Sequence, residues 1–191
     1  MANHFFAMLG RMKYINRWGL MRSTRTETLS EHTLDTAFIA HALAVIRNKR
    51  FGGNVNVEKV VLHALYHDAT EIITGDLPTP IKYYDGDIKA SYKRIEEQAR
   101  DRLSSLLPED LRGEFEPYLG HGDEETEKIV KAADKVSALI KCTEEEQMNN
   151  REFGCAKESV LAAINAMDLP ELKVFMEEFF PSYGLSLDEQ R

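Results

Sequence analysis

The chain has 191 residues, of which 43% are hydrophobic and 29% are charged, values that suit a globular protein with a substantial apolar core. Its net charge of -8 argues against binding to a long nucleic acid, which needs a basic face, and no apolar run approaches the ~18 residues that span a bilayer. Two cysteines, Cys142 and Cys155, lack a CxxC spacing and imply no disulfide framework, so with no secretory signal evident we expect a cytoplasmic protein.

The N-terminal segment is locally basic within this acidic chain. Its first 25 residues contain no acid and five basic residues: Arg11, Lys13, Arg17, Arg22 and Arg25. A solvated loop beside a helix end explains this pattern, and an Arg-rich targeting peptide is a weaker alternative. A functional interpretation is a local anion site that fits a small phosphate ester.

Two helices are predicted in the next part of the chain. The first starts near Ser30, a capping-type residue, and carries an apolar stripe before a break at Gly52-Gly53-Asn54: Leu34, Phe38, Val45 and Ile46. The second runs from about Asn56 to Ile73 and is apolar on nearly all sides, which predicts a buried central helix. It ends near Thr74-Gly75-Asp76, and residues 77–80 (Leu-Pro-Thr-Pro) form a stiff loop.

Further helical patterns follow, and no segment alternates with period two as a strand does. Ile88 to Leu106 marks a long amphipathic helix, Pro108 opens a short one, and Ile129 to Ile140 marks another. Asp168-Leu169-Pro170-Glu171 is typical of an N-cap followed by a first-turn proline. The sequence therefore predicts an all-α class, a compact bundle of about six to eight helices.

The most informative residues lie in the predicted central helix. His67, Asp68 and Glu71 occupy i, i+1 and i+4, so they point toward one side of a helix. Burying three ionisable groups costs several kcal/mol unless something compensates, and a metal ion does so by accepting imidazole and carboxylate together. A surface patch or a helix-end ion pair is the plainer alternative.

Two other residues gain meaning only beside this group. His32 lies in the first turn of the helix near Ser30, and Asp134 interrupts the apolar run from Ile129 to Val136. Taken singly, His32 is explained by capping and Asp134 by pairing with a neighbouring lysine.

A His on one helix, a His-Asp pair on the next and a distant Asp together resemble the HD superfamily. Further segments extend the match to bacterial 5'-deoxynucleotidases of the YfbR type over nearly the whole chain: residues 14–18 (Tyr-Ile-Asn-Arg-Trp), 30–32 (Ser-Glu-His), 51–54 (Phe-Gly-Gly-Asn), 67–71 (His-Asp-Ala-Thr-Glu), 75–82 (Gly-Asp-Leu-Pro-Thr-Pro-Ile-Lys) and 185–189 (Leu-Ser-Leu-Asp-Glu). The resemblance implies a single HD domain over 1–191.

The resemblance implies a site with one divalent transition-metal ion held by His32, His67, Asp68 and Asp134. Two imidazoles and two carboxylates suit cobalt, manganese or zinc better than calcium. Glu71 would act as a general acid or base.

The substrate implied by the resemblance is a deoxyribonucleoside 5'-monophosphate. Arg17 would hold its phosphate through a planar guanidinium, and Trp18 would orient the phosphate and help to exclude a ribose 2'-hydroxyl. Asp76 would lie near the sugar or the leaving oxygen as a second catalytic group. The remaining substrate contacts are implied for Leu77, Pro78, Thr79 and the metal-site residues His32, Asp68 and Asp134.

Two alternatives stay open from the residues alone. One is an HD phosphohydrolase acting on another ester, such as a cyclic nucleotide or a deoxynucleoside triphosphate, although a triphosphate site would need more cationic groups than Arg17. The other is a non-catalytic nucleotide-binding protein. The resemblance also implies a homodimer without a polymeric nucleic acid or membrane as partner.

Overall fold

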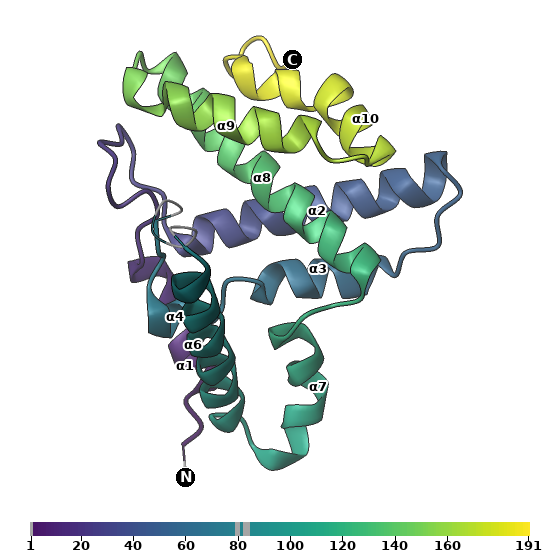
Figure 1. Cartoon of the computed structure of the whole chain (residues 1–191). Coiled ribbons are helices and arrows are strands. Elements are labelled where there is room, and N and C mark those ends of the chain that lie inside the picture. Colours follow the sequence, from purple (N-terminus) through teal and green to yellow (C-terminus); the bar gives the residue numbers. More distant parts are fainter. Residues whose placement is uncertain (1, 79–80, 82–84) are drawn as a thin grey trace.

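The computed structural model describes residues 2–78, 81 and 85–191, and the regular secondary structure in these ranges is helical (Figure 1). Short 3-10 turns occur at Met12–Tyr14, Arg151–Phe153 and Phe180–Gly184. In chain order the helices are α1 (Phe5–Leu9), α2 (Leu29–Arg50), α3 (Val57–Tyr66), α4 (Glu71–Thr74), α6 (Gly86–Ser105), α7 (Glu109–Leu119), α8 (Glu124–Gln147), α9 (Gly154–Asn165) and α10 (Pro170–Glu178). The predicted all-α class is confirmed. Within the described ranges, no helix has the length and apolarity that crossing a membrane requires.

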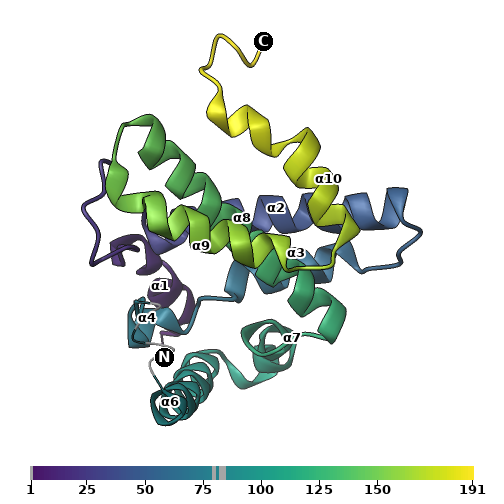
Figure 2. The same ribbon diagram turned by 45° about the horizontal axis from the view of Figure 1, so that its top comes forward.

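Helix α2 is the centre of the arrangement. It packs against both α3 and α8, while α9 lies along α8 and α10 crosses α2 (Figures 1 and 2). On the other side of α3, the short helices α1 and α4 lie beside α6, and α6 packs against α7. The chain thus forms two helical groups that meet near the end of α3.

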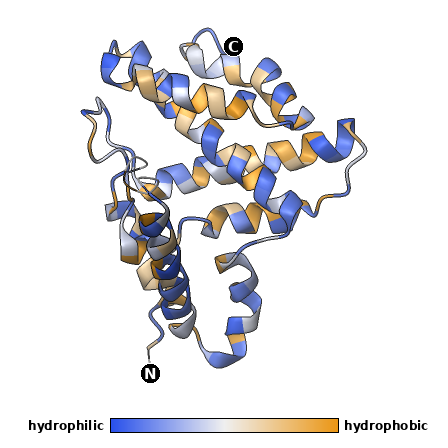
Figure 3. Ribbon diagram, in the orientation of Figure 1, coloured by the Kyte–Doolittle hydropathy of each residue, from blue (hydrophilic) through white to orange (hydrophobic). Residues whose placement is uncertain are grey.

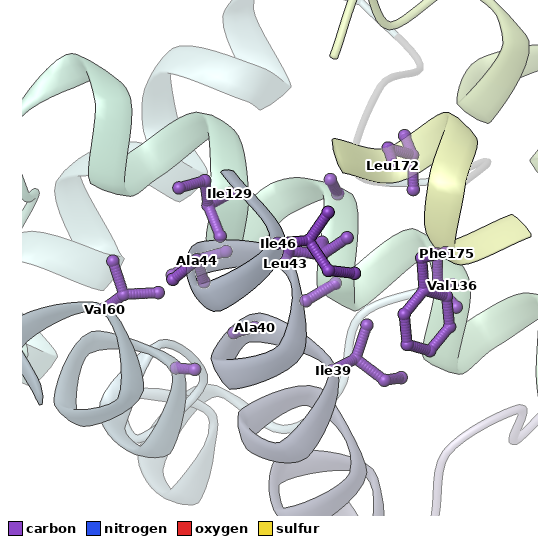
Figure 4. Packing of buried hydrophobic residues seen from close by; sticks show 14 of the residues in the cluster. Ile39, Ala40, Leu43, Ala44, Ile46, Val60, Ile129, Val136, Leu172 and Phe175 are labelled. Atoms are coloured by element: carbon purple, nitrogen blue, oxygen red, sulfur yellow. The ribbon is translucent and has the colours of Figure 1, made fainter. Parts of the chain in front are cut away.

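The larger apolar cluster lies between α2, α3, α8, α9 and α10. Hydrophobic residues concentrate where the central helices face one another, whereas α6 is largely hydrophilic (Figure 3). Figure 4 shows the interdigitation of side chains from four helices: Ile39, Ala40, Leu43, Ala44, Ile46, Val60, Ile129, Val136, Leu172 and Phe175. This packing fixes α2 and α8 relative to α3, so polar side chains on their facing surfaces have fixed positions.

A smaller apolar cluster joins α1, α6 and α7. Its buried members are Phe5, Ala69, Leu103, Leu107 and Leu119. Ala69 belongs to the turn after α3, only five residues beyond Ala64 of the larger cluster. The turn at residues 67–70 is therefore held between the two apolar clusters.

Helix α2 begins at Leu29, one residue before the predicted start at Ser30, and Thr28 caps it in a capping box. The Thr28 hydroxyl accepts a hydrogen bond from the backbone N–H of Glu31, and the Glu31 carboxylate accepts one from the backbone N–H of Thr28. Such a cap stabilises a helix by about 1 kcal/mol and places His32 in the first turn.

The apolar stripe predicted for α2 is wrong for three of its four residues. Leu34 and Phe38 are 50% and 65% exposed and Val45 is also exposed, whereas Ile46 is buried. The buried face of α2 includes many small or polar residues, among them Thr33, Thr36, Ala37, Ala40 and Ala44. Because α3 and α8 approach this face closely, alanine and threonine fill it, and a count of large apolar residues selects the opposite side.

The predicted central helix from about Asn56 to Ile73 is also interrupted. Helix α3 ends at Tyr66, residues 67–70 form turns, and α4 resumes for a single turn from Glu71. Leu65 and Ile73 are exposed at its surface. The His-Asp pair therefore lies in a break between two helices.

The later helices largely follow the predicted pattern. α6, α7 and α8 span the predicted segments, although Ile95 is exposed. At α10, Pro170 occupies the first turn as predicted, but the N-cap is Leu169, and no side chain caps the helix.

Candidate metal centre

Three elements bring the four predicted metal ligands to one place. His32 lies in the first turn of α2, His67 and Asp68 lie in the turn after α3, and Asp134 lies in the middle of α8. The packing of α2 against both α3 and α8 brings these residues together although they are distant in sequence.

The distances between these side chains describe a compact group. Ligand atoms of His32, His67 and Asp68 all lie within 4.8 Å of one another. Asp134 adjoins this trio, because its Oδ1 lies 3.2 Å from His32 Nε2, and Asp68 Oδ2 lies 3.6 Å from the same nitrogen. Asp68 Oδ2 also lies 3.1 Å from His67 Nε2.

Both imidazoles present one nitrogen to the group and use the other elsewhere. His67 Nδ1 lies 2.7 Å from the carbonyl oxygen of Ala64, which can only accept, so Nδ1 carries the proton and leaves Nε2 as the ligand atom of the neutral ring. His32 Nδ1 lies 3.0 Å from the hydroxyl of Ser137. Among the described residues, neither Nε2 has a hydrogen-bond partner of acceptable geometry, although both are buried. Two buried nitrogens of this kind beside carboxylates fit a divalent transition metal.

The pKa values of His67 and Asp68 also indicate that this group of side chains favours a positive charge. Burial lowers the pKa of His67, but the charge and close approach of Asp68 and the charge of Asp134 outweigh burial and raise this pKa to about 9. Conversely, burial raises the pKa of Asp68, while His67 and then His32 lower it to about 2. The aspartates therefore stay ionised and attract positive charge to the centre.

His32 responds in the opposite direction. Burial, and then the positive charge of Arg17, lower the pKa of His32 to about 4 despite its contact with Asp134. Burial raises the pKa of Asp134, but the close approach and charge of His32 and the charge of Lys135 hold it well below its usual value. His32 is thus neutral at neutral pH, the form in which imidazole binds metals.

Glu71 lies one turn beyond the His-Asp pair. It is buried in the first turn of α4, and its backbone N–H donates to the carbonyl oxygen of Asp68. The bond attaches α4 directly to the turn that carries the centre.

Arg17 and Trp18 lie in a segment before α2 in which residues 15–17 pair through their backbone with residues 27–29. The N–H of Arg17 donates to the carbonyl oxygen of Glu27, and the N–H of Leu29 donates to that of Ile15. The Glu27 carboxylate accepts the indole N–H of Trp18 at 2.8 Å and lies 3.4 Å from Nε of Arg17. Burial raises the pKa of Glu27, and Arg17 and Trp18 oppose that effect.

The backbone at Trp18 has a conformation that bulky residues rarely adopt. Its φ is 60°, in the left-handed region, which costs about 1–3 kcal/mol for a residue with a large side chain. Contacts on several sides hold it there, including the Glu27 bond and the Phe153 ring, whose centroid lies 5.3 Å away. Backbone strain of this kind concentrates at functional sites.

The other basic residues of the N-terminal segment do not join Arg17. Arg22 pairs with Glu152 and Arg25 with Glu31, and both arginine side chains are exposed. Arg17 is instead nearly buried, and its positive charge lowers the pKa of His32.

The predicted substrate loop is described only in part. Asp76, Leu77 and Pro78 are half-buried and follow α4 directly after Gly75. Thr79 lies outside the described residues. Roles for these four residues stay predictions.

Two other histidines do not contribute to the centre. His63 is buried in α3, where its ring contacts Tyr118 of α7 and Gly122 lies close to it. His41 is exposed on α2. These contacts make His63 a packing residue between α3 and α7.

Sequence reasoning missed two residues that contact the site. Glu27 is the first acidic residue of the chain and follows a basic segment without acids. That order was a signal that Glu27 pairs with one of the preceding arginines. Ser137 lies one helical turn after Asp134, and a polar pair at i, i+3 in an apolar helix was its signal.

Comparison with known proteins identifies relatives over nearly the whole chain. A family model described as 5'-deoxynucleotidase YfbR-like matches residues 4–183. A 5'-deoxynucleotidase of Vibrio parahaemolyticus is 50% identical over 189 residues, which cover 98% of this chain and 97% of that protein. The 5'-deoxynucleotidase YfbR of Escherichia coli is also 50% identical, over 98% of this chain and 95% of its own length.

Solved structures share the fold at lower identity. An HD-domain phosphohydrolase from Listeria innocua has a TM-score of 0.82 and 24% identity, covering 94% of this chain and 88% of that one. The HD phosphohydrolase DatZ of cyanophage S-2L, solved with dA and one catalytic Zn²⁺, has a TM-score of 0.65 and 17% identity, covering 93% and 95%. At these identities the likeness supports the helical HD-domain fold.

Proposed function

The chain belongs to the family of YfbR-like 5'-deoxynucleotidases, and from this membership we propose that it hydrolyses deoxyribonucleoside 5'-monophosphates to the deoxynucleoside and phosphate. One structural observation carries the proposal. The buried Nε2 atoms of His32 and His67 converge with the carboxylate of Asp68 within 4.8 Å, and the charge of a nearly buried arginine, Arg17, acts on His32. This arrangement supports a cation site that works with a phosphate-binding arginine.

His32, His67, Asp68 and Asp134 would hold the cation. When bound, a divalent transition metal supplies Lewis-acid activation of water and of a phosphoryl oxygen. We propose one ion per chain, with cobalt, manganese or zinc as the candidates that the nitrogen and oxygen donors favour. His32, Asp68 and Asp134 also border the space in which the phosphate would lie.

Glu71 would move the proton. Its buried carboxylate lies one turn after the ligands, where it can take a proton from the attacking water or deliver one to the leaving 5'-oxygen. Asp76, just beyond α4, would assist at the leaving oxygen or the sugar.

Arg17 would bind the phosphate, because a guanidinium matches two phosphate oxygens and the charge of this one already acts on His32. Trp18 would form the wall that meets the deoxyribose. Leu77, Pro78 and Thr79 would complete the nucleotide contacts after Asp76.

Phosphate release from purified protein tests the proposal. With cobalt, manganese or zinc added, deoxyribonucleoside monophosphates should release phosphate faster than the matching ribonucleotides. Glu71→Gln should lower kcat by about 100-fold or more, as expected for the loss of a general acid or base, while keeping metal affinity.

Matched histidine variants separate the site from the rest of α2. His32→Ala should abolish metal-dependent hydrolysis, whereas His41→Ala, on the exposed face of the same helix, should not change it. Release from triphosphates or cyclic nucleotides in preference to monophosphates would instead indicate another HD phosphohydrolase. Nucleotide binding without release from any ester would indicate a binding protein.

We also propose that residues 1–191 form a single HD domain that acts in the cytoplasm as a homodimer. The family match over residues 4–183 supports the single domain. Light scattering after size-exclusion chromatography should give twice the mass of one chain, and a monomer mass would contradict the dimer.

A further inference from the structure

The Glu27 carboxylate lies between two residues of the proposed substrate site. Glu27 is only 9% exposed. Oε2 accepts the indole N–H of Trp18 at 2.8 Å and lies 3.4 Å from Nε of Arg17. Neither metal binding nor proton transfer uses this carboxylate in the proposed reaction, so its burial needs another explanation, since a buried charge costs free energy unless its partners compensate.

The hydrogen bond has a direct consequence for Trp18. An indole has a single N–H donor. While this donor binds Glu27, it cannot also donate to a phosphate, so Trp18 acts on a nucleotide through the surface of its ring. A ring that discriminates by shape must have a fixed plane.

Glu27 and Phe153 hold that plane from two sides, and the guanidinium of Arg17 lies over the ring at 6.0 Å from its centroid. Glu27 holds the N–H edge, and the buried ring of Phe153 lies against the indole with 5.3 Å between centroids and 58° between planes. Glu27 is itself held in place, because its backbone oxygen accepts the N–H of Arg17 beside the antiparallel bridge of Asn16 and Thr28. The acceptor is therefore preorganised by the backbone.

We infer that Glu27 is a positioning residue that fixes the indole of Trp18 and thereby sets the discrimination between 2'-deoxyribose and ribose substrates. The inference rests on the proposed function. The reason is that Trp18 would exclude a 2'-hydroxyl by steric contact. An indole that is free to rotate about its side-chain torsions would move aside and accommodate the additional oxygen of ribose. Releasing the N–H would leave the indole in contact with the ring of Phe153 and the guanidinium of Arg17, neither of which holds its N–H edge.

Three variants separate the hydrogen bond from the charge. Glu27→Gln keeps an oxygen acceptor for the indole and removes the negative charge beside Arg17. Glu27→Leu fills the same space without an acceptor. Glu171→Leu is the matched control, because Glu171 is also a buried glutamate paired with an arginine, Arg47 near the opposite end of α2.

The measurement is the ratio of kcat/KM for a deoxyribonucleotide to that for the ribonucleotide with the same base. Glu27→Leu should lower this ratio by about tenfold, mainly by raising activity on the ribonucleotide, as expected for one lost hydrogen bond at a discriminating wall. Glu27→Gln and Glu171→Leu should keep the wild-type ratio.

Fluorescence provides a second readout without substrate. Trp18 is the single tryptophan of the chain, so emission excited at the tryptophan band reports on this residue alone. Glu27→Leu should shift the emission maximum and increase quenching by acrylamide, whereas the Gln variant and the Glu171 control should resemble wild type.

The outcomes distinguish the inference from the proposed function. If the wild type releases no phosphate from deoxynucleotides, the proposed function fails, whatever the fluorescence shows. If the wild type is active and a folded Glu27→Leu keeps the wild-type ratio, or Glu171→Leu lowers the ratio equally, the inference is wrong. Should Glu27→Leu not fold, Glu27→Asp replaces it, since the shorter side chain withdraws the acceptor while keeping the charge, and an unchanged ratio in that variant overturns the inference.

Discussion

His32 and His67 have neighbouring rings whose pKa values are shifted in opposite directions. The ring centroids are 5.5 Å apart, yet burial and Arg17 lower the pKa of His32 to about 4, while the aspartates overcome burial and raise that of His67 to about 9. One added positive charge therefore belongs at this centre near neutral pH. A divalent ion would replace the proton of His67 and use both Nε2 atoms, so the same arrangement suits the metal.

Ser137 should control how well His32 binds the metal. Its hydroxyl lies 3.0 Å from His32 Nδ1 and orients the ring so that Nε2 faces the carboxylates. We expect Ser137→Ala to weaken metal affinity by about 10- to 100-fold, as the loss of such partners does in metal sites. Competition with a chelating dye measures the affinity, and circular dichroism checks the fold.

A second hydroxyl on α8 provides the control for this variant. Thr143 donates to the carbonyl oxygen of Leu139 within the helix. Thr143→Val should therefore keep wild-type metal affinity. Equal affinity of Ser137→Ala and wild type would show that His32 is oriented by packing alone.

The sequence could predict which side chains converge at the candidate metal centre but not the residues that support them. His67 and Asp68 are adjacent in an apolar segment, so local spacing revealed them, and the family pattern then added His32 and Asp134. Ser137 contacts His32 across 105 positions of sequence. Such a contact depends on how α2 and α8 cross, which no local pattern specifies.

The segment before α2 is anchored to α8 by one buried acid, Glu145. Its carboxylate accepts hydrogen bonds from the backbone N–H of Thr24, the ammonium of Lys141 and the amide of Asn150. Lys141 also donates to the carbonyl oxygen of Arg25. The loop that follows Trp18 therefore has a fixed end on the helix that carries Asp134.

Glu145 should make stability depend on pH under acidic conditions. Burial raises the pKa of Glu145, but the hydrogen bonds from Lys141 and Thr24 outweigh it and lower this pKa to about 2. Because the folded-state pKa lies below the unfolded value, this contribution is complete above pH ~4.5 and is lost as pH falls toward 2. Its full size is about 3 kcal/mol from the pKa shift.

Comparison with Glu145→Gln isolates this contribution. Wild type should exceed the variant in unfolding free energy at pH 6, and the difference should shrink steadily as pH falls. Urea unfolding followed by circular dichroism at several pH values measures it. A difference that stays constant or widens toward low pH would show that Glu145 is not held ionised by these contacts.

Helix positions were easier to predict than the faces that they bury. Periodicity found α2, α6 and α8, because long amphipathic segments carry a strong signal. It selected the wrong face of α2, since Ala40 and Ala44 are buried there while Leu34 and Phe38 are exposed. The break after Tyr66 was also missed, because residues 67–70 contain neither glycine nor proline.

Across the whole molecule, the turn at residues 67–70, which carries two of the predicted ligands, lies where two apolar clusters meet. The larger cluster holds α2, α3 and α8 in place, and the smaller one encloses Ala69 with α1, α6 and α7. His67 and Asp68 lie between Ala64 of the first cluster and Ala69 of the second. The position of the metal ligands therefore depends on both cores, although neither core contains a catalytic group.

Leu43 tests which face of α2 stabilises the molecule. It is fully buried in the larger cluster, so Leu43→Ala should lower the free energy of unfolding by about 2–5 kcal/mol. Leu34→Ala, on the exposed face of the same helix, should change it by less than about 0.5 kcal/mol. Denaturant unfolding at two protein concentrations measures both variants. If Leu34→Ala instead lowers the free energy of unfolding, and lowers it more at the higher protein concentration, this face of α2 lies in an interface between two copies of the chain. Only a residue in such an interface contributes to stability in a way that depends on protein concentration.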